Sequence, residues 1–419
     1  MTHRTCHRLT AAFSLAFALT AAADSKPSPR LPANARVAII GDSITEQKLY
    51  SKFIETYLLA CTARKDIKCF QFGWGGETAA GFSNRLENDL SVFSPTVATT
   101  CYGMNDGRYV PYAETIGADY EKWMRTVLTK LKAAGVTSIV AGSPGVVDSK
   151  YFVKAGATAA QYNDSLAHLR DIDKKLAAEF NTAFADVHGE MLNAMVAAKA
   201  KLGPDYDVGG RDGVHPGANG HLLMAAAFLK GLGLDGNIGE ITLDLKGAST
   251  ASEGHQASGS NGSADLVSTV YPFCFDDATR SILPFCKFNE ELNRLTLRVK
   301  NLTAASARVT WGTESKEFTK DQLTSGINLA AEFKKTPFDA AFAGVINAIR
   351  VKQEYETPMI KGMITNFRNF AADAKTDAEF AAALETLKKK MLTKQGKLDA
   401  DVRSLLVPVQ HSLKVEASK

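Results

Sequence analysis

Residues 36–45 read Arg-Val-Ala-Ile-Ile-Gly-Asp-Ser-Ile-Thr, and this stretch decides the fold. Val37–Ile40 is a short, mostly β-branched apolar run, which is typical of a strand buried on both faces. The run stops at a Gly-Asp-Ser turn, and apolar residues over 49–61 then recur at helical spacing. Ser43 therefore lies where a buried strand ends and a helix is about to begin. In open α/β sheets, ligands bind in the crevice at such strand ends.

Strand and helix patterns alternate from this stretch to Gly231. The apolar runs that predict strands are Val37–Ile40, Ile67–Phe72, Val97–Cys101, Val136–Ala141 and Ala183–Val187. Helical patterns follow each of these runs, and a final helix is expected over about 218–229. Five strands alternating with helices predict a three-layer α/β fold around a parallel sheet with right-handed crossovers. The pattern does not fix the order of the strands.

The character of the sequence changes after Gly239. Short strands are expected at 241–245, 266–271, 295–299 and 307–311, whereas residues 247–263 are rich in Gly, Ser and Ala and favour a linker or a mobile hairpin loop. From Asp321 onward the pattern is helical, with a break near Pro337 and a kink or a break near Pro358. At 419 residues the chain is long enough for two domains. We therefore expect an α/β domain at 35–238 and a smaller α+β accessory region at 239–419.

The N-terminus has the pattern of a secretory signal peptide, residues 1–23. Two arginines precede an apolar stretch at 9–20 that is too short to span a bilayer. Small residues then favour cleavage after Ala23, before a proline-containing lead-in at 24–34. A buried N-terminal helix is the less favoured alternative. We therefore expect a secreted or periplasmic protein without a transmembrane segment.

Charge and cysteine content narrow the possible partners. The formal net charge is +4, and loss of the two leader arginines brings it close to neutrality, so nothing favours nucleic acid as a partner. An exported protein can form disulfides, and Cys61 with Cys69, or Cys274 with Cys286, are plausible local pairs. Cys101 lies in an apolar run and is expected to stay a free thiol. No cysteine spacing resembles a zinc site.

Four polar clusters lie at predicted strand ends or in the last loop. They are Gly41-Asp42-Ser43, Gly73-Trp74-Gly75-Gly76-Glu77-Thr78, Gly103-Met104-Asn105-Asp106 and Asp212-Gly213-Val214-His215-Pro216. Each cluster alone is ordinary turn chemistry. Their combination, in this order and at these positions, is much more specific.

Together the clusters supply the parts of a serine mechanism. A serine hydroxyl needs an adjacent base, which His215 can provide, and Asp212 lies three positions earlier, where it can orient the imidazole. A developing oxyanion needs preorganised donors. The backbone N–H groups of Ser43 and Gly76 and the amide of Asn105 can serve. The Gly-x-Ser-x-Gly elbow is absent, which argues against the α/β-hydrolase fold itself.

These clusters resemble the four signature blocks of the SGNH, or GDSL-type, hydrolases. The second cluster is similar to the family's G-x-x-G-D-T, with Glu77 in place of Asp, and the others are similar to its G-D-S, G-x-N-D and D-G-x-H-P blocks. The resemblance covers about residues 35–232. It implies a flavodoxin-like α/β/α sandwich and esterase chemistry that uses no metal or organic cofactor.

The resemblance also assigns roles to individual residues. It implies that Ser43 is the nucleophile, His215 the base and Asp212 its orienting partner, with Ser43, Gly76 and Asn105 as the oxyanion hole. The C-terminal region resembles the tails of exported bacterial proteins that carry this domain. This resemblance implies no activity for the region.

Three further residues are candidates for substrate contact. They are Asp42, Trp74 and Asp106. Trp74 can line an acyl or sugar pocket or pack within the fold. Asp106 is better explained as a solvated loop residue than as a substrate contact.

The leading hypothesis is an exported serine esterase acting on small-molecule or polysaccharide esters, with O-acetylated carbohydrate preferred. Export and the absence of a long, lid-like apolar helix favour that substrate over lipid. The alternatives are a lysophospholipase or acyl-esterase of the same type, and a polysaccharide-binding protein with a vestigial catalytic domain. The complete set of four clusters argues against the last. Hydrolysis and acyl transfer both stay open, and so does the oligomeric state.

Overall fold

The computed structural model describes Met1 and residues 30–418, so the predicted leader beyond Met1 and most of the lead-in lie outside the described residues. One part of the chain is built on a parallel sheet. Its strands are β1 (Arg36–Gly41), β2 (Lys68–Gly73), β3 (Val97–Cys101), β4 (Ser138–Gly142) and β5 (Ala183–Ala185). Their order is β2-β1-β3-β4-β5. This is the flavodoxin-like order, so the predicted fold class is confirmed.

Helices cover both faces of this sheet. They are α1 (Ser43–Glu46), α2 (Tyr50–Thr56), α3 (Ala79–Phe93), α4 (Glu114–Ala133), α5 (Ala159–Glu179), α6 (Val187–Leu202) and α7 (Ala218–Gly231), with a π-helical turn η1 (Tyr57–Cys61) after α2. Successive strand residues point to opposite faces. Val37 and Ile39 therefore belong to the core formed with α2, α6 and α7. Ala38 and Ile40 belong to the core formed with α3, α4 and α5.

The C-terminal region contributes two more sheets. One has the order β13-β10-β6-β7 and the other β12-β11-β14-β9-β8. Their strands are β6 (Asn237–Asp244), β7 (Thr250–Ala251), β8 (His255–Ser258), β9 (Ser263–Ser268), β10 (Arg294–Lys300), β11 (Ser306–Trp311), β12 (Glu314–Thr319), β13 (Ile327–Asn328) and β14 (Val409–Ala417). Short helices connect them: α8 (Asp277–Arg280), η2 (Leu283–Phe285), α9 (Phe288–Leu292), α10 (Lys320–Ser325) and α11 (Leu329–Glu332). An α+β accessory region is thus confirmed.

The prediction of a linker or loop at 247–263 was wrong. This stretch contains β7 and β8, and β8 pairs with β9 in an antiparallel register from His255–Ser268 to Ser258–Asp265. Sheet hydrogen bonds are made by the backbone, so a composition of small residues does not prevent strand pairing. Gly259 and Gly262 have positive φ values of 140° and 82° and form the turn between the two strands.

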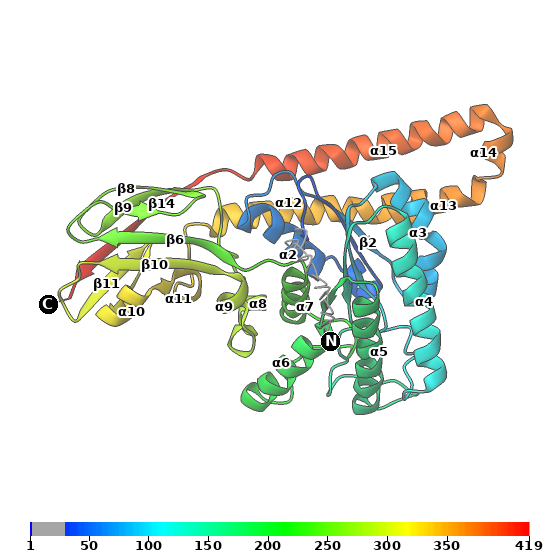
Figure 1. The fold of residues 1–419 in the computed structure, drawn as a ribbon, viewed down its shortest axis with the longest axis horizontal. Coiled ribbons are helices and arrows are strands. Elements are labelled where there is room, and N and C mark those ends of the chain that lie inside the picture. Colours follow the sequence, from blue (N-terminus) through cyan, green and yellow to red (C-terminus); the bar gives the residue numbers. More distant parts are fainter. Residues whose placement is uncertain (2–29, 419) are drawn as a thin grey trace.

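Long helices carry the chain back onto the α/β part. They are α12 (Asp339–Thr357), the π-helical η3 (Pro358–Ile364), α13 (Thr365–Phe367), η4 (Arg368–Phe370), α14 (Asp373–Thr376) and α15 (Ala378–Ser404). Figure 1 shows α12 and α15 side by side, running from the C-terminal sheets across the parallel sheet. The break expected near Pro337 is present, whereas at Pro358 the chain stays helical and changes from the α-helical α12 to the π-helical η3.

A buried ion cluster joins α12 to the parallel sheet. Lys352 of α12 is fully buried, and its Nζ lies 2.9 Å from carboxylate oxygens of both Glu55 and Glu356. The same Nζ donates to the Cys69 carbonyl of β2 at 2.8 Å. Removing one partner would leave a buried charge uncompensated, so α12 is firmly fixed to the sheet. The boundary between residues 238 and 239 stays a prediction.

The cysteines do not pair as expected. All five cysteines within residues 30–418 are free thiols, so the plausible pairs Cys61–Cys69 and Cys274–Cys286 do not form, whereas Cys101 is free as predicted. The thiol of Cys61 lies at the end of η1 near Cys274, and that of Cys69 lies in β2 beside the Lys352 cluster. Cys61 and Cys69 are close in sequence but lie on different elements, the end of η1 and the strand β2, so their thiols do not meet. Burial raises the pKa of both thiols.

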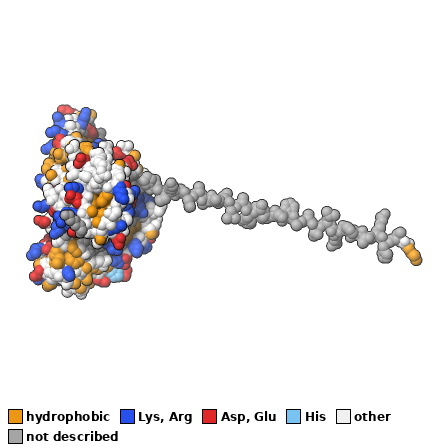
Figure 2. Space-filling model, turned by 90° about the vertical axis from the view of Figure 1, so that its left-hand side faces the viewer, with side chains coloured by type: hydrophobic (Ala, Val, Ile, Leu, Met, Phe, Trp, Pro, Cys, Tyr) orange, Lys and Arg blue, Asp and Glu red, His pale blue; other side chains and the backbone are white. Residues whose placement is uncertain are grey.

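Charged side chains are mixed over the surface formed by the C-terminal sheets. Figure 2 shows acidic and basic groups interspersed at that end of the molecule. Over the described part of the chain, we find no helix with the length and apolar character needed to cross a membrane.

A chain of buried hydrogen bonds fixes the core of the C-terminal sheets. The indole of Trp311 can only donate, so Nδ1 of His411 must accept, at 3.1 Å. Nε2 of His411 then donates to the Ser268 hydroxyl at 2.8 Å. That hydroxyl donates to Nδ1 of His255 at 2.8 Å, and Nε2 of His255 donates to the Ile238 carbonyl at 3.0 Å. Both imidazoles are therefore neutral in the folded protein.

Acid is expected to destabilise this network. Burial lowers the pKa of His411 to about 4, and also lowers that of His255. Because the unfolded chain takes up protons below about pH 6.5 and the folded protein does not, stability falls as the pH drops from 6.5 towards 4. Through the lowered pKa of His411 alone, the free energy of unfolding should fall by about 2 kcal/mol between pH 7.5 and pH 5. Urea unfolding at pH 7.5 and pH 5 should show a smaller fall in the free energy of unfolding for His411→Gln than for the wild type. An equal fall in both proteins would mean that His411 is not its source.

Candidate active site

Ser43 stands at the start of α1, directly after β1. Gly41 ends the strand, and a Cβ there would lie 2.1 Å from Thr45 Oγ1, so only glycine fits. Asp42 caps α1: its Oδ1 accepts from the Ile44 N–H at 2.9 Å. Burial raises the pKa of Asp42 to about 7, although the bond from Ile44 opposes this. Asp42 is 2% exposed, so its observed role is to shape the turn that presents Ser43.

Ser43, His215 and Asp212 form one chain of hydrogen bonds. Nε2 of His215 lies 2.8 Å from the Ser43 hydroxyl oxygen, and Nδ1 lies 2.6 Å from Asp212 Oδ2. The other oxygen of Asp212 accepts from the N–H groups of Val214 and His215 at 2.9 and 2.8 Å. The loop between α6 and α7 thus brings two residues to a serine more than 160 positions away in sequence.

The Asp212 carboxylate is held in its ionised form. Burial opposes ionisation, but the backbone N–H groups of His215 and Val214 and the His215 ring outweigh it and lower the pKa of Asp212. An ionised Asp212 keeps the proton of the imidazole on Nδ1. Nε2 is then free to accept the proton of Ser43.

Gly76 and Asn105 lie on the loops that follow β2 and β3. Gly76 has a φ of +73°, and a Cβ there would meet nothing within 4 Å, so its backbone conformation rather than crowding calls for glycine. Asn105 donates from Nδ2 to the Glu77 carbonyl at 3.0 Å and accepts at Oδ1 from Tyr109 at 3.1 Å. These two bonds fix the amide. Nδ2 also lies 3.5 Å from Asp42 Oδ2, a long contact that an oxyanion acceptor would replace.

Glu77, which replaces the aspartate of the resembled block, is buried in an ion pair. Arg85 Nε donates to Glu77 Oε1 at 2.7 Å, and Arg85 Nη2 and the Tyr102 hydroxyl donate to Oε2 at 2.8 Å each. These bonds hold the loop whose carbonyl orients Asn105. The sequence pattern predicts no role for Glu77, because its partners lie on α3 and directly after β3.

Trp74 and Asp106 make contacts within the fold. The Arg85 guanidinium carbon lies 4.9 Å, and Lys361 Nζ 5.0 Å, from the centre of the Trp74 ring. Asp106 accepts from the N–H groups of Ala79 and Gly103 at 3.0 Å each. Burial raises the pKa of Asp106 to about 6, against the effect of these bonds. A role of either residue in substrate contact stays a prediction.

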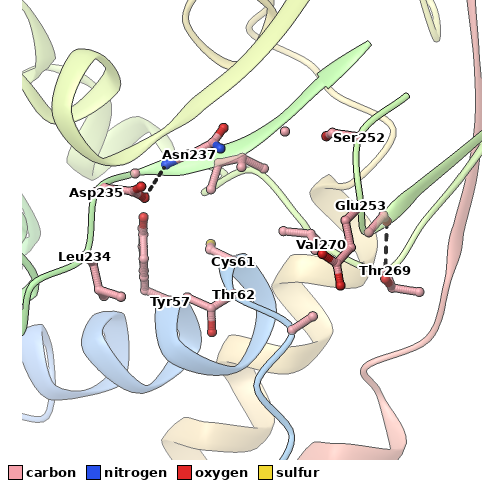
Figure 3. A pocket seen from close by; sticks show the side chains of 15 residues that line it. Tyr57, Cys61, Thr62, Leu234, Asp235, Asn237, Ser252, Glu253, Thr269 and Val270 are labelled. Atoms are coloured by element: carbon pink, nitrogen blue, oxygen red, sulfur yellow. Dashed lines mark hydrogen bonds between the residues drawn. The ribbon is translucent and has the colours of Figure 1, made fainter. Parts of the chain in front are cut away.

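Two cavities are relevant to the site. One of about 340 Å³ adjoins Gly75 and Gly76, and Arg368 of η4 lines it together with Trp74 and Arg85. Another, of about 630 Å³, lies between η1 and the C-terminal sheets, where Tyr57, Asp235 and Glu253 line it (Figure 3). Ser43, Asp212 and His215 line neither of these two cavities. In the described residues, no group of three or more His, Cys, Asp or Glu side chains is arranged to hold a metal ion.

Comparisons with known proteins bear on the family and the fold. The sequence signature of the GDSL-like lipase/acylhydrolase family matches residues 39–223. A gut microbial diltiazem-metabolizing enzyme has a TM-score of 0.72 at 21% identity, covering 93% of this chain and 99% of its own, and so shares the fold of both regions. No curated protein matches the sequence.

Two other solved structures cover 49% of this chain. An acetylxylan esterase from Geobacillus stearothermophilus has a TM-score of 0.41 at 22% identity over 97% of its chain. A protein from Parabacteroides merdae described as a GDSL-like lipase has a TM-score of 0.42 at 24% identity over 99% of its chain. Both scores are too low to carry weight. Residues 39–223 are therefore a GDSL-like lipase/acylhydrolase domain, and the protein is an ester-hydrolysing enzyme.

Proposed function

We propose that this enzyme is an exported serine esterase that hydrolyses carboxylic esters of short acyl groups, with O-acetylated carbohydrate as the preferred substrate. The observation that carries the proposal is the hydrogen-bond chain from Asp212 through His215 to Ser43, at 2.6 and 2.8 Å. It supplies a nucleophile, a base and an orienting carboxylate at the carboxyl end of a parallel strand, where open α/β sheets bind ligands.

The first half of the reaction makes an acyl-enzyme. His215 Nε2 takes the Ser43 proton as the hydroxyl oxygen attacks the ester carbonyl, and Asp212 stabilises the imidazolium. The Ser43 N–H, at the first position of α1, has no partner within the helix and can donate to the oxyanion. The Gly76 N–H and the Asn105 amide are the other proposed donors. His215 then gives its proton to the departing alcohol.

The second half releases the acid. Water attacks the acyl-enzyme while His215 accepts its proton, and collapse of the second tetrahedral intermediate returns the proton to Ser43. If an alcohol attacked instead of water, the result would be acyl transfer. The side chains of His215 and Asp212 are 34% and 56% exposed, which gives water ready access and favours hydrolysis.

The polar cavity beside Gly76, which Ser43, Asp212 and His215 do not line, supports small, polar substrates through its position next to the proposed oxyanion-hole loop. It measures about 340 Å³, and polar side chains make up much of its lining: Glu77, Thr78, Asn84, Arg85 and Arg368. A long acyl chain needs a continuous apolar surface, because its affinity comes from burying methylene groups. The lining therefore favours an acetyl ester of a polar alcohol over a lysophospholipid.

Acyl length should separate these substrate classes. We expect the kcat/KM for 4-nitrophenyl acetate to exceed that for the dodecanoate by about tenfold or more, the scale on which pockets discriminate chain length. Acetylated xylo-oligosaccharides and diltiazem can then be compared as acetyl donors. A higher kcat/KM for the dodecanoate would favour the acyl-esterase alternative. Equal inactivity of wild type and Ser43→Ala on every ester would favour the vestigial one.

A further inference from the structure

A C-terminal segment packs directly against the loop that carries Gly76. This segment is η3, whose Met359, Ile360 and Ile364 are buried in the same core as Phe72 of β2 and the apolar face of α3. A π-helical turn widens the helix and is frequent at functional sites. Here it lies at the end of α12, which is itself anchored through the buried Lys352.

Lys361 projects from η3 towards the loop. Its Nζ lies 2.9 Å from Glu46 Oε1 and 5.0 Å from the centre of the Trp74 ring. The other oxygen of Glu46 accepts from the Gly75 N–H at 2.6 Å. Glu46 belongs to α1, the helix that begins at Ser43. One ion pair therefore connects the Ser43 helix, the Gly75–Gly76 turn and the C-terminal region.

The surrounding contacts fix the position of Lys361. The Thr365 hydroxyl donates to Asp89 at 2.7 Å, and Asn88 donates to the Ile364 carbonyl at 2.9 Å. Arg368 donates to the Asn84 carbonyl at 3.1 Å. These three contacts are made to α3, on which Asp89, Asn88 and Asn84 lie. Because α3 directly follows the Gly76 loop, the same helix holds both this loop and η3 in place.

The Gly75–Gly76 turn itself depends on Glu46. A Cβ at Gly75 would come within 2.8 Å of Glu46 Oε2, so the carboxylate fills the place where a side chain would stand. Gly75 and Gly76 are both exposed, and a glycine pair loses more conformational freedom on ordering than other residues. The Glu46 carboxylate, and the Lys361 ammonium that holds it, therefore offset the conformational entropy that this glycine pair loses when the turn is ordered.

We propose that Lys361 is a positioning residue of the oxyanion hole, acting through Glu46 and the Trp74 ring to hold the Gly76 N–H where the oxyanion forms. This inference rests on the proposed function. It gives the accessory region a defined task in the reaction. Because the oxyanion exists only in the transition state and the intermediates, loss of Lys361 should lower kcat and leave KM unchanged.

The test compares variants at Lys361 with a matched lysine. Lys361→Met is expected to lower kcat for 4-nitrophenyl acetate about tenfold, less than the hundredfold typical of losing a whole donor. Lys361→Arg should keep most of the activity, since arginine can pair with Glu46 and lie over Trp74. Lys375→Met, an exposed lysine of α14, should match the wild type. Thermal unfolding of each variant shows that the loss does not follow stability.

A double variant checks the route of action. If Lys361 works through Glu46, Lys361→Met should add little to the loss caused by Glu46→Ala. The inference is overturned if Lys361→Met has wild-type kcat, raises only KM, or lowers kcat equally in the Glu46→Ala background. The proposed function fails separately, if Ser43→Ala retains activity. The two failures are thus distinguishable.

Discussion

Replacing Ser43 with alanine is expected to lower kcat/KM for an acetyl ester by about ten thousand-fold or more, the scale seen when a serine nucleophile is removed. The hydroxyl is the group that Nε2 of His215 faces at 2.8 Å, and alanine leaves no atom there to be acylated. A burst of 4-nitrophenol in the wild type, absent from the variant, would report the acyl-enzyme directly.

Controls for Ser43→Ala can be matched closely. Ser91→Ala, at an exposed serine of α3, should have wild-type activity. The double variant Ser43→Ala with His215→Ala should be no less active than Ser43→Ala alone, because residues that act as one unit do not contribute additively. Activity that persists in Ser43→Ala at more than a few per cent of wild type would exclude Ser43 as the nucleophile.

Asn105→Ala is expected to lower kcat by about a hundredfold or more with little change in KM, as loss of one oxyanion donor does. The amide is already oriented by Tyr109 and the Glu77 carbonyl, and its remaining N–H has only the long 3.5 Å contact with Asp42 Oδ2 to give up when the oxyanion forms. Single-turnover kinetics would place the loss in the chemical step.

Tyr109→Phe separates donation from orientation. It removes only the hydroxyl that holds Asn105 Oδ1, so we expect a loss of less than about tenfold, in keeping with one neutral hydrogen bond. An unchanged rate in Asn105→Ala would remove that amide from the mechanism. A loss in Tyr109→Phe as large as that in Asn105→Ala would mean that orientation by the hydroxyl, rather than donation alone, sets the rate.

The α/β part of the fold could be predicted because its signals are local. Buried parallel strands are continuous apolar runs. The turn after β1 is marked by Gly41, where a side chain would clash with residues close by. The carboxyl ends of parallel strands share one edge, so Ser43, Gly76 and Asn105 could be expected near one another. The late loop that brings His215 to them could be assigned only by the order of the clusters.

The C-terminal region could be predicted only in part, because its contacts are distant in sequence. β14 was missed: it lies between β11 and β9, whose residues are far earlier in the chain. The ion pair of Glu46 with Lys361 spans 315 positions and leaves no periodic signal. The cysteine pairs failed for the related reason that sequence proximity does not set side-chain direction.

The position of β14 also bears on how the protein matures. Its residues are synthesised after those of every other strand, yet they occupy the middle of a five-stranded sheet. Until they arrive, β9 and β11 each present an unpaired edge, and such edges recruit other chains. This sheet can therefore be completed only after the residues of β14 have been synthesised.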